Sequence, residues 1–69
     1  MDMRFTLTLN NAVVQGEMID ALVIDWTQET NHDNIMQISR DWNEDGESVA
    51  RNMVGLMHVG EMSLSIEAT

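Results

Sequence analysis

The two ends of the chain share one pattern, in which apolar and polar residues alternate one by one. Alternation with period two is typical of a strand that buries one face and exposes the other. We therefore predict strands over 3–9 and 61–67, and we expect them to share a small sheet with helices packed on a single face. The apolar positions of the two segments are Met3, Phe5, Leu7, Leu9, Met62, Leu64 and Ile66.

Residues 47–59 have the spacing of an amphipathic helix, with apolar side chains along one side of the helical wheel. Asp45 is placed to cap its N-terminus, and Gly60 is placed to end it in a left-handed conformation. We predict a helix over 47–59. The residues of its apolar side are Val49, Ala50, Met53, Val54, Leu56 and Met57.

The stretch 12–30 allows two interpretations. Spacing of i, i+3, i+4 and i+7 indicates an amphipathic helix, which Asn11 could cap, and it is shown by Ile19, Leu22, Val23 and Trp26. Three poor helix residues speak against an early start: Val13, Val14 and Gly16. The alternative is a hairpin in which 5–9 and 12–14 pair around Asn10 and Asn11, because asparagine tolerates positive φ. We favour the helix over 12–30.

Residues 33–42 fit a short helix and a middle strand equally well. The chain contains no linker, repeat or cysteine, so a single compact domain over 1–69 is expected. The predicted class is α+β. It consists of a small sheet of two or three strands (3–9 and 61–67), covered on one face by two or three helices (12–30 and 47–59).

Twelve acidic residues stand against three arginines and no lysine, which gives a formal net charge of −9. A magnitude of roughly 2–8 is enough to keep a small domain in solution. Direct nucleic-acid binding is disfavoured because phosphate contacts need lysine or arginine. A role at a membrane surface is disfavoured for the same reason, because acidic membrane surfaces attract basic segments. The acidity therefore serves either a basic protein partner, or plain solubility and adaptation to salt.

Catalysis has little support in the sequence. His32 and His58 are the only candidates for acid–base chemistry near neutral pH, and no cysteine nucleophile exists. A chain this short would also have difficulty enclosing a pocket of several hundred cubic ångströms. We predict no enzyme and no cofactor. Because the sequence shows no secretory leader and no long apolar run, a cytoplasmic protein is expected.

The stretch Asp41–Gly46 matches the first half of an EF-hand calcium loop, whose ligands here would be Asp41, Asn43 and Asp45. The match ends there, since position 12 of the loop is Asn52 and not the bidentate glutamate. A polar turn that leads into a helix is the favoured interpretation. A calcium-binding, helix-loop-helix-like module stays as an alternative, as does an acidic adaptor that binds partners through a Met/Trp surface.

In length, lack of cysteine and acid excess, the chain resembles the small acidic inhibitor proteins of phages and mobile elements, in particular anti-CRISPR proteins directed at type I systems, which include DNA mimics. The resemblance implies a stoichiometric inhibitor in the cytoplasm of the host cell. Its partner would be a basic nucleic-acid-binding protein, with a CRISPR effector as the candidate, and we favour a monomer. The acids predicted to bind the partner are Glu17, Asp20, Asp25, Glu29, Asp33, Asp41, Glu44, Asp45 and Glu47. We expect the acids of helix 12–30 and of 41–47 to form one continuous negative face.

Overall fold

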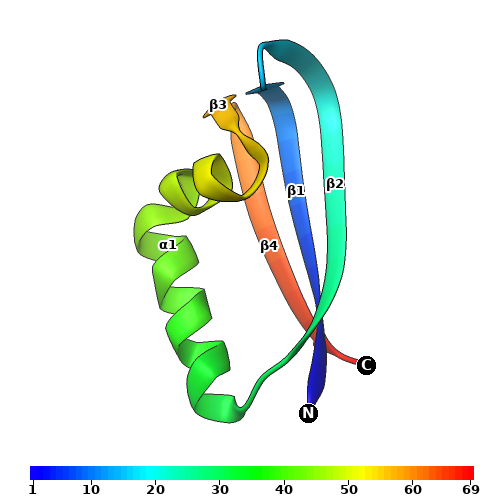
Figure 1. Cartoon of the computed structure of the whole chain (residues 1–69), viewed down its shortest axis with the longest axis vertical. Coiled ribbons are helices and arrows are strands. Elements are labelled where there is room, and N and C mark those ends of the chain that lie inside the picture. Colours follow the sequence, from blue (N-terminus) through cyan, green and yellow to red (C-terminus); the bar gives the residue numbers. More distant parts are fainter.

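A computed structural model describes all residues, 1–69, and confirms the α+β class. One helix packs with a single antiparallel sheet (Figure 1). The elements in chain order are β1 (Asp2–Val14), β2 (Glu17–Glu29), α1 (His32–Val54), β3 (Leu56–His58) and β4 (Glu61–Ala68).

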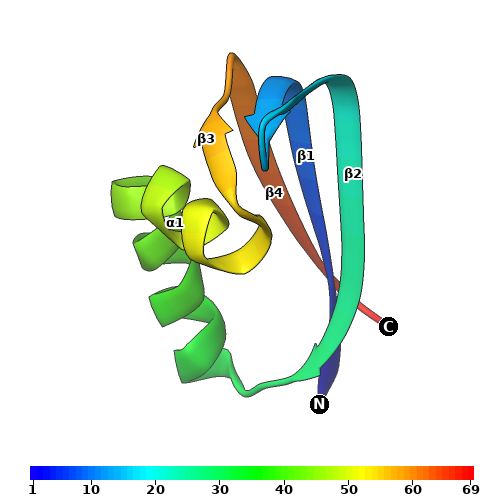
Figure 2. The ribbon, with the colours of Figure 1, turned by 45° about the horizontal axis from the view of Figure 1, so that its top comes forward.

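The N-terminal strand is the centre of the sheet. β1 pairs with β2 along one edge, and along the other it pairs with β4 and then with β3. Figure 2 shows β3 beside β1, where the chain leaves α1. The predicted strands over 3–9 and 61–67 are therefore confirmed as neighbours, and Arg4 stands opposite Glu67. Each extends beyond its predicted length.

The core lies between the sheet and the C-terminal part of α1. Phe5, Leu7 and Leu9 are fully buried on the inner face of β1, and Ala50 of α1 is fully buried with them. The ring of Phe5 stacks on that of Trp26, with centroids 5.2 Å apart and planes 8° from parallel. Only nine residues are buried in all, so this small cluster supplies most of the hydrophobic stabilisation.

The predicted helix over 12–30 is wrong, because this stretch forms the end of β1, a tight turn and the whole of β2. Leu22 and Ile24 are half-buried on the inner face, whereas Val23 between them is exposed. The alternative interpretation correctly predicted a β-hairpin in this part of the chain, but it placed the turn at Asn10 and Asn11. The chain reverses at Gln15 and Gly16, whose φ values of 50° and 86° have the positive sign that a type I′ hairpin turn requires.

The helix α1 contains both 33–42, which the sequence left open, and residues 47–54 of the predicted helix 47–59. It begins after Asn31, whose side-chain oxygen accepts a hydrogen bond of 2.9 Å from the backbone N–H of Asn34. Asp45 does not cap a separate helix. Its φ of −146° and ψ of 39° instead produce a kink inside α1.

The predicted end of this helix at Gly60 is also wrong. Gly55 has a φ of 74° and donates its N–H to the carbonyl of Arg51, so the helix ends five residues earlier. Gly55 precedes Gly60 in the chain and adopts the left-handed conformation that ends the helix. Leu56 and Met57, which follow it, therefore belong to β3. The backbone N–H of Gly60 instead bonds to β1, at the carbonyls of Asn10 and Asn11.

Candidate functional site

The acidic side chains are all on the surface. Each of the twelve is exposed, and only Asp25 takes part in an ion pair, which leaves eleven carboxylates without one. On ordinary protein surfaces lysine and arginine are interspersed among the acids. The surface of this protein therefore has a net negative charge that its own cations do not neutralise.

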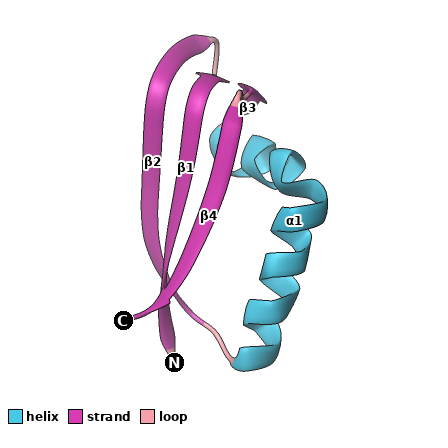
Figure 3. Ribbon diagram, turned by 180° about the vertical axis from the view of Figure 1, so that it is seen from behind, coloured by secondary structure: helices cyan, strands magenta, loops and turns pink.

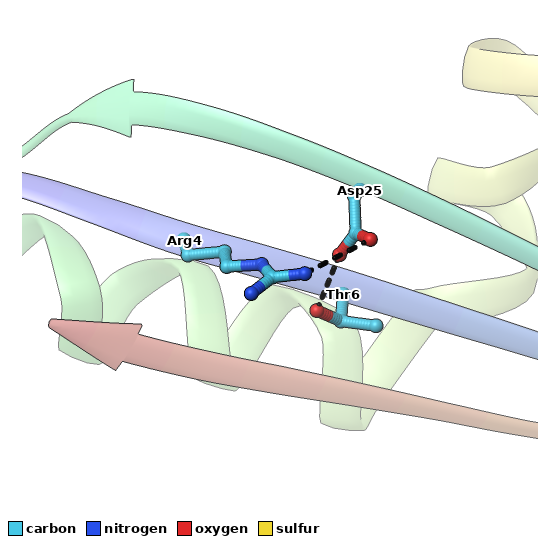
Figure 4. A network of polar contacts seen from close by, with 3 residues as sticks. All are labelled: Arg4, Thr6 and Asp25. Carbon is cyan, nitrogen blue, oxygen red and sulfur yellow. Dashed lines mark hydrogen bonds and ion pairs between the residues drawn. The ribbon is translucent and has the colours of Figure 1, made fainter. Parts of the chain in front are cut away.

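The one ion pair lies on the outer face of the sheet, with α1 on the opposite side of the strands (Figure 4). The Arg4 guanidinium donates to Asp25 Oδ2 at 3.2 Å, and the Thr6 hydroxyl donates to Asp25 Oδ1 at 2.7 Å. The hydrogen bond from Thr6 and that from Arg4 lower the pKa of the Asp25 carboxyl, and the same contact raises the pKa of Arg4. Asp25 is thus the predicted partner-binding acid whose charge is most compensated.

Asp25→Asn gives a test of this network. A carboxyl whose folded pKa lies below the 3.8 of a free aspartate stabilises the protein above that value, and the contribution is lost as the pH falls through the folded pKa. We expect the variant to melt below the wild type at pH 7, by a small margin because the pair is exposed, and the difference to vanish once the pH falls below the folded pKa of Asp25. Thermal melts followed by circular dichroism measure it. A difference that persists unchanged at acid pH would contradict this assignment.

The nine predicted partner-binding acids divide between two layers of the fold. Glu17, Asp20, Asp25 and Glu29 lie on β2, and Asp33 lies in the first turn of α1. The other four lie around the kink of α1. Because the helix predicted over 12–30 is a strand of the sheet, its four acids do not extend the face of α1 in the way the sequence suggested. We name the four acids around the kink of α1 the kink cluster: Asp41, Glu44, Asp45 and Glu47.

The kink brings the second part of α1 down onto the sheet at Gly46, which is buried. A Cβ atom at this position would lie 2.7 Å from Met62 Cε and 3.3 Å from Trp42 Cε3, so the close approach requires glycine or a shift of these side chains. The bend leaves the kink cluster exposed. The nearest cation in sequence, Arg40, is hydrogen-bonded to Gln37 at 3.0 Å, and Gln37 in turn donates to Asp41 at 2.8 Å.

The calcium-loop interpretation of Asp41–Gly46 does not fit the structure. These residues belong to α1, which includes the kink at Asp45, and they do not form an open loop. In a helix, residues two positions apart point to different sides, so the oxygens of Asp41, Asn43 and Asp45 do not converge as those of a calcium loop do. No group of three or more acidic or histidine side chains in the chain is arranged to hold a metal ion.

Next to the kink cluster, a groove of about 430 Å³ runs between α1 and β4. Its walls mix apolar with neutral polar side chains and contain no titratable one, so the groove offers no group for acid–base chemistry. Sequence reasoning missed this groove, although the alternation in β4 does identify the residues of one wall. The lining residues are Ser39, Trp42 and Asn43 from α1, and Met62, Ser63, Leu64 and Ile66 from β4.

α1 lacks the continuous apolar stretch that a helix needs to cross a membrane. A scan against models of protein families finds no match, and searches of curated proteins and of solved structures find none either.

Proposed function

We propose that this protein is a stoichiometric inhibitor, similar in action to DNA-mimicking anti-CRISPR proteins. It binds a basic nucleic-acid-binding surface of a host defence complex, with a CRISPR effector as the candidate, and blocks nucleic-acid binding there. The observation that supports the proposal is the set of eleven exposed carboxylates that make no ion pair. The partner supplies the cations that the protein itself lacks.

The physical basis is electrostatic complementarity. A groove that tracks phosphates concentrates positive potential, and carboxylates fixed on a folded surface compete with nucleic acid for it. Such association is fast at low salt. It weakens as salt rises, because the Debye length falls from about 30 Å at 0.01 M to about 8 Å at 0.15 M.

The kink cluster is the best candidate for the contact surface. It places four carboxylates within seven residues of one helix, and none of them is in an ion pair. The acids of β2 are spread over thirteen residues, and Arg4 compensates Asp25 among them. The charge density around the kink is therefore the higher of the two.

The test is a competition assay in which the protein displaces labelled DNA or RNA from candidate effector complexes over a series of NaCl concentrations. Asp41→Asn, Glu44→Gln, Asp45→Asn and Glu47→Gln are combined in one variant. If each lost charge weakens binding by roughly 0.5–1 kcal/mol, the four together weaken it by about 100-fold and flatten its dependence on salt.

A matched control removes four charges elsewhere, by Asp2→Asn, Glu17→Gln, Asp20→Asn and Glu29→Gln. It has the same net charge as the kink-cluster variant but keeps the kink cluster, so it is expected to lose much less inhibition. Circular dichroism confirms that both variants fold. Unchanged competition by the kink-cluster variant, with the salt dependence of the wild type, would exclude this cluster as the mimic.

A further inference from the structure

We infer that the free edge of β4, together with the groove beside it, is a docking site for an extended segment of the partner protein. The segment would have apolar residues alternating with lysine or arginine, and it would join the sheet as an additional strand. The inference rests on the proposed function for the basic character of the partner. It goes further by naming the shape and pattern of the segment that is bound.

The first observation is the open edge. β4 pairs only with β1, and no strand of the protein lies along its other side. Every second residue of this eight-residue strand therefore presents an unpaired backbone N–H and C=O, which an incoming strand can satisfy. Figures 1 and 3 show α1 beyond β4, on the side away from β1 and β2, so a strand added there would lie next to the helix.

The second observation is the groove between these two elements. Met62, Leu64 and Ile66 project from the inner face of β4 but are only half-buried, and Trp42 of α1 lies across from them. Alternate side chains of a strand are about 7 Å apart. An added strand would place its own alternate side chains in the groove with the same repeat, where apolar ones would cover the incompletely buried surface.

The third observation is charge. Trp42, Asn43 and Met62 line both the groove and an adjoining depression that Glu44, Asp45 and Glu47 border. The groove beside β4 thus continues directly into the kink cluster. Glu61 and Glu67 lie at the two ends of β4, on its exposed positions. A complementary segment carries apolar residues toward the groove and cations toward these acids.

The same charges argue against a second copy of the chain at this edge. Antiparallel pairing of two β4 strands about their centre would set Glu61 of each against Glu67 of the other. It would also bring together two molecules with a net charge of −9 each. β2 also has a free edge, and the groove of about 230 Å³ on its side is lined mainly by apolar residues with one acid, Asp41. Three acids border the depression that adjoins the β4 groove, so β4 is the edge that suits a basic segment better.

The experiment uses a blocked nine-residue peptide in which valine and lysine alternate, with its affinity measured by calorimetry. Ser39→Trp fills the groove without removing a core contact, and Asn52→Trp is the control on an exposed part of α1. We expect Ser39→Trp to weaken binding by about tenfold or more and Asn52→Trp to leave it unchanged. A peptide that is N-methylated on every second residue, and so cannot donate along one edge, should lose affinity by a similar factor. Bound peptide should also slow amide exchange in residues 61–68.

Three results would overturn the inference. In the first, nonalysine binds as tightly as the alternating peptide, and Ser39→Trp does not weaken binding of the alternating peptide. The attraction would then be electrostatic only. The second is no binding of the alternating peptide at all. The third is a dimer in solution, detected by light scattering, that the alternating peptide cannot dissociate. The competition assay of the proposed function uses no peptide. Competition that persists with the salt dependence expected of the wild type, while the alternating peptide fails to bind, would reject this docking site and leave the proposed function standing.

Discussion

Replacing Leu7 by alanine is expected to remove a large share of the protein's free energy of unfolding at 25 °C. Leu7 is fully buried at the centre of β1, in the same cluster as Ala50 and Leu56. Truncating such a leucine costs about 2–5 kcal/mol, because the cavity left behind closes only in part. A domain of this length has a total stability of roughly 3–10 kcal/mol. Urea denaturation followed by circular dichroism measures the loss.

The matched control is Val23→Ala on β2, a side chain that is 56% exposed. It should change the free energy of unfolding by less than about 1 kcal/mol, while Leu22→Ala next to it should cost clearly more. In the helix predicted from the sequence, both residues lie on one buried stripe, and the two substitutions would cost similar amounts. Equal losses would therefore contradict the strand assignment of β2.

The terminal strands could be predicted because each buries only one face. Met3, Phe5 and Leu7 are buried while Arg4 between them is exposed, so burial and the period of two agree. In β2 the signal was ambiguous. Leu22, Ile24 and Trp26 do alternate, but the exposed Val23 completes a helical spacing with Ile19 and Trp26 that the structure does not use.

The position of the hairpin turn and the length of α1 could not be predicted, because they depend on contacts that the local sequence pattern does not show. Gln15 adopts a positive φ that is uncommon for its residue type, whereas Asn11, also at positive φ, lies within β1. The kink at Asp45 accompanies the close approach of Gly46 to Met62 of β4, a residue far away in the sequence. Tertiary contacts of this kind decide a conformation without leaving a local signature.

The candidate site was predictable in its residues but not in its arrangement. The acid excess identifies exposed carboxylates, and all nine predicted ones are exposed. Their division between β2 and α1 results from the topology of the sheet. The sequence prediction missed this division because it assigned residues 12–30 to a helix. The groove beside β4 could not be foreseen, because it is formed by α1 and β4, whose relative placement is a property of the whole fold.

Salt is expected to stabilise the protein, and the kink-cluster variant should respond to it less. The molecule measures 35 × 22 × 16 Å, so at 0.01 M salt, where the Debye length is about 30 Å, its carboxylates repel one another across the whole structure. At 1 M the Debye length is about 3 Å, and the repulsion is largely screened. If about 2 kcal/mol is recovered, the melting temperature rises by about 10 °C.

Removing the four charges of the kink cluster changes the formal net charge from −9 to −5, so the variant should melt above the wild type at 0.01 M salt and converge with it at 1 M. The same substitutions are expected to weaken partner binding, and opposite effects on stability and binding are what a surface kept for recognition produces. A wild-type protein that stays unfolded below molar salt would instead assign the acids to salt adaptation. Binding to a partner that is insensitive to salt would favour an adaptor that uses its apolar surface. Thermal melts over a NaCl series, with both proteins side by side, distinguish these outcomes, because only the inhibitor folds at low salt and binds most tightly there.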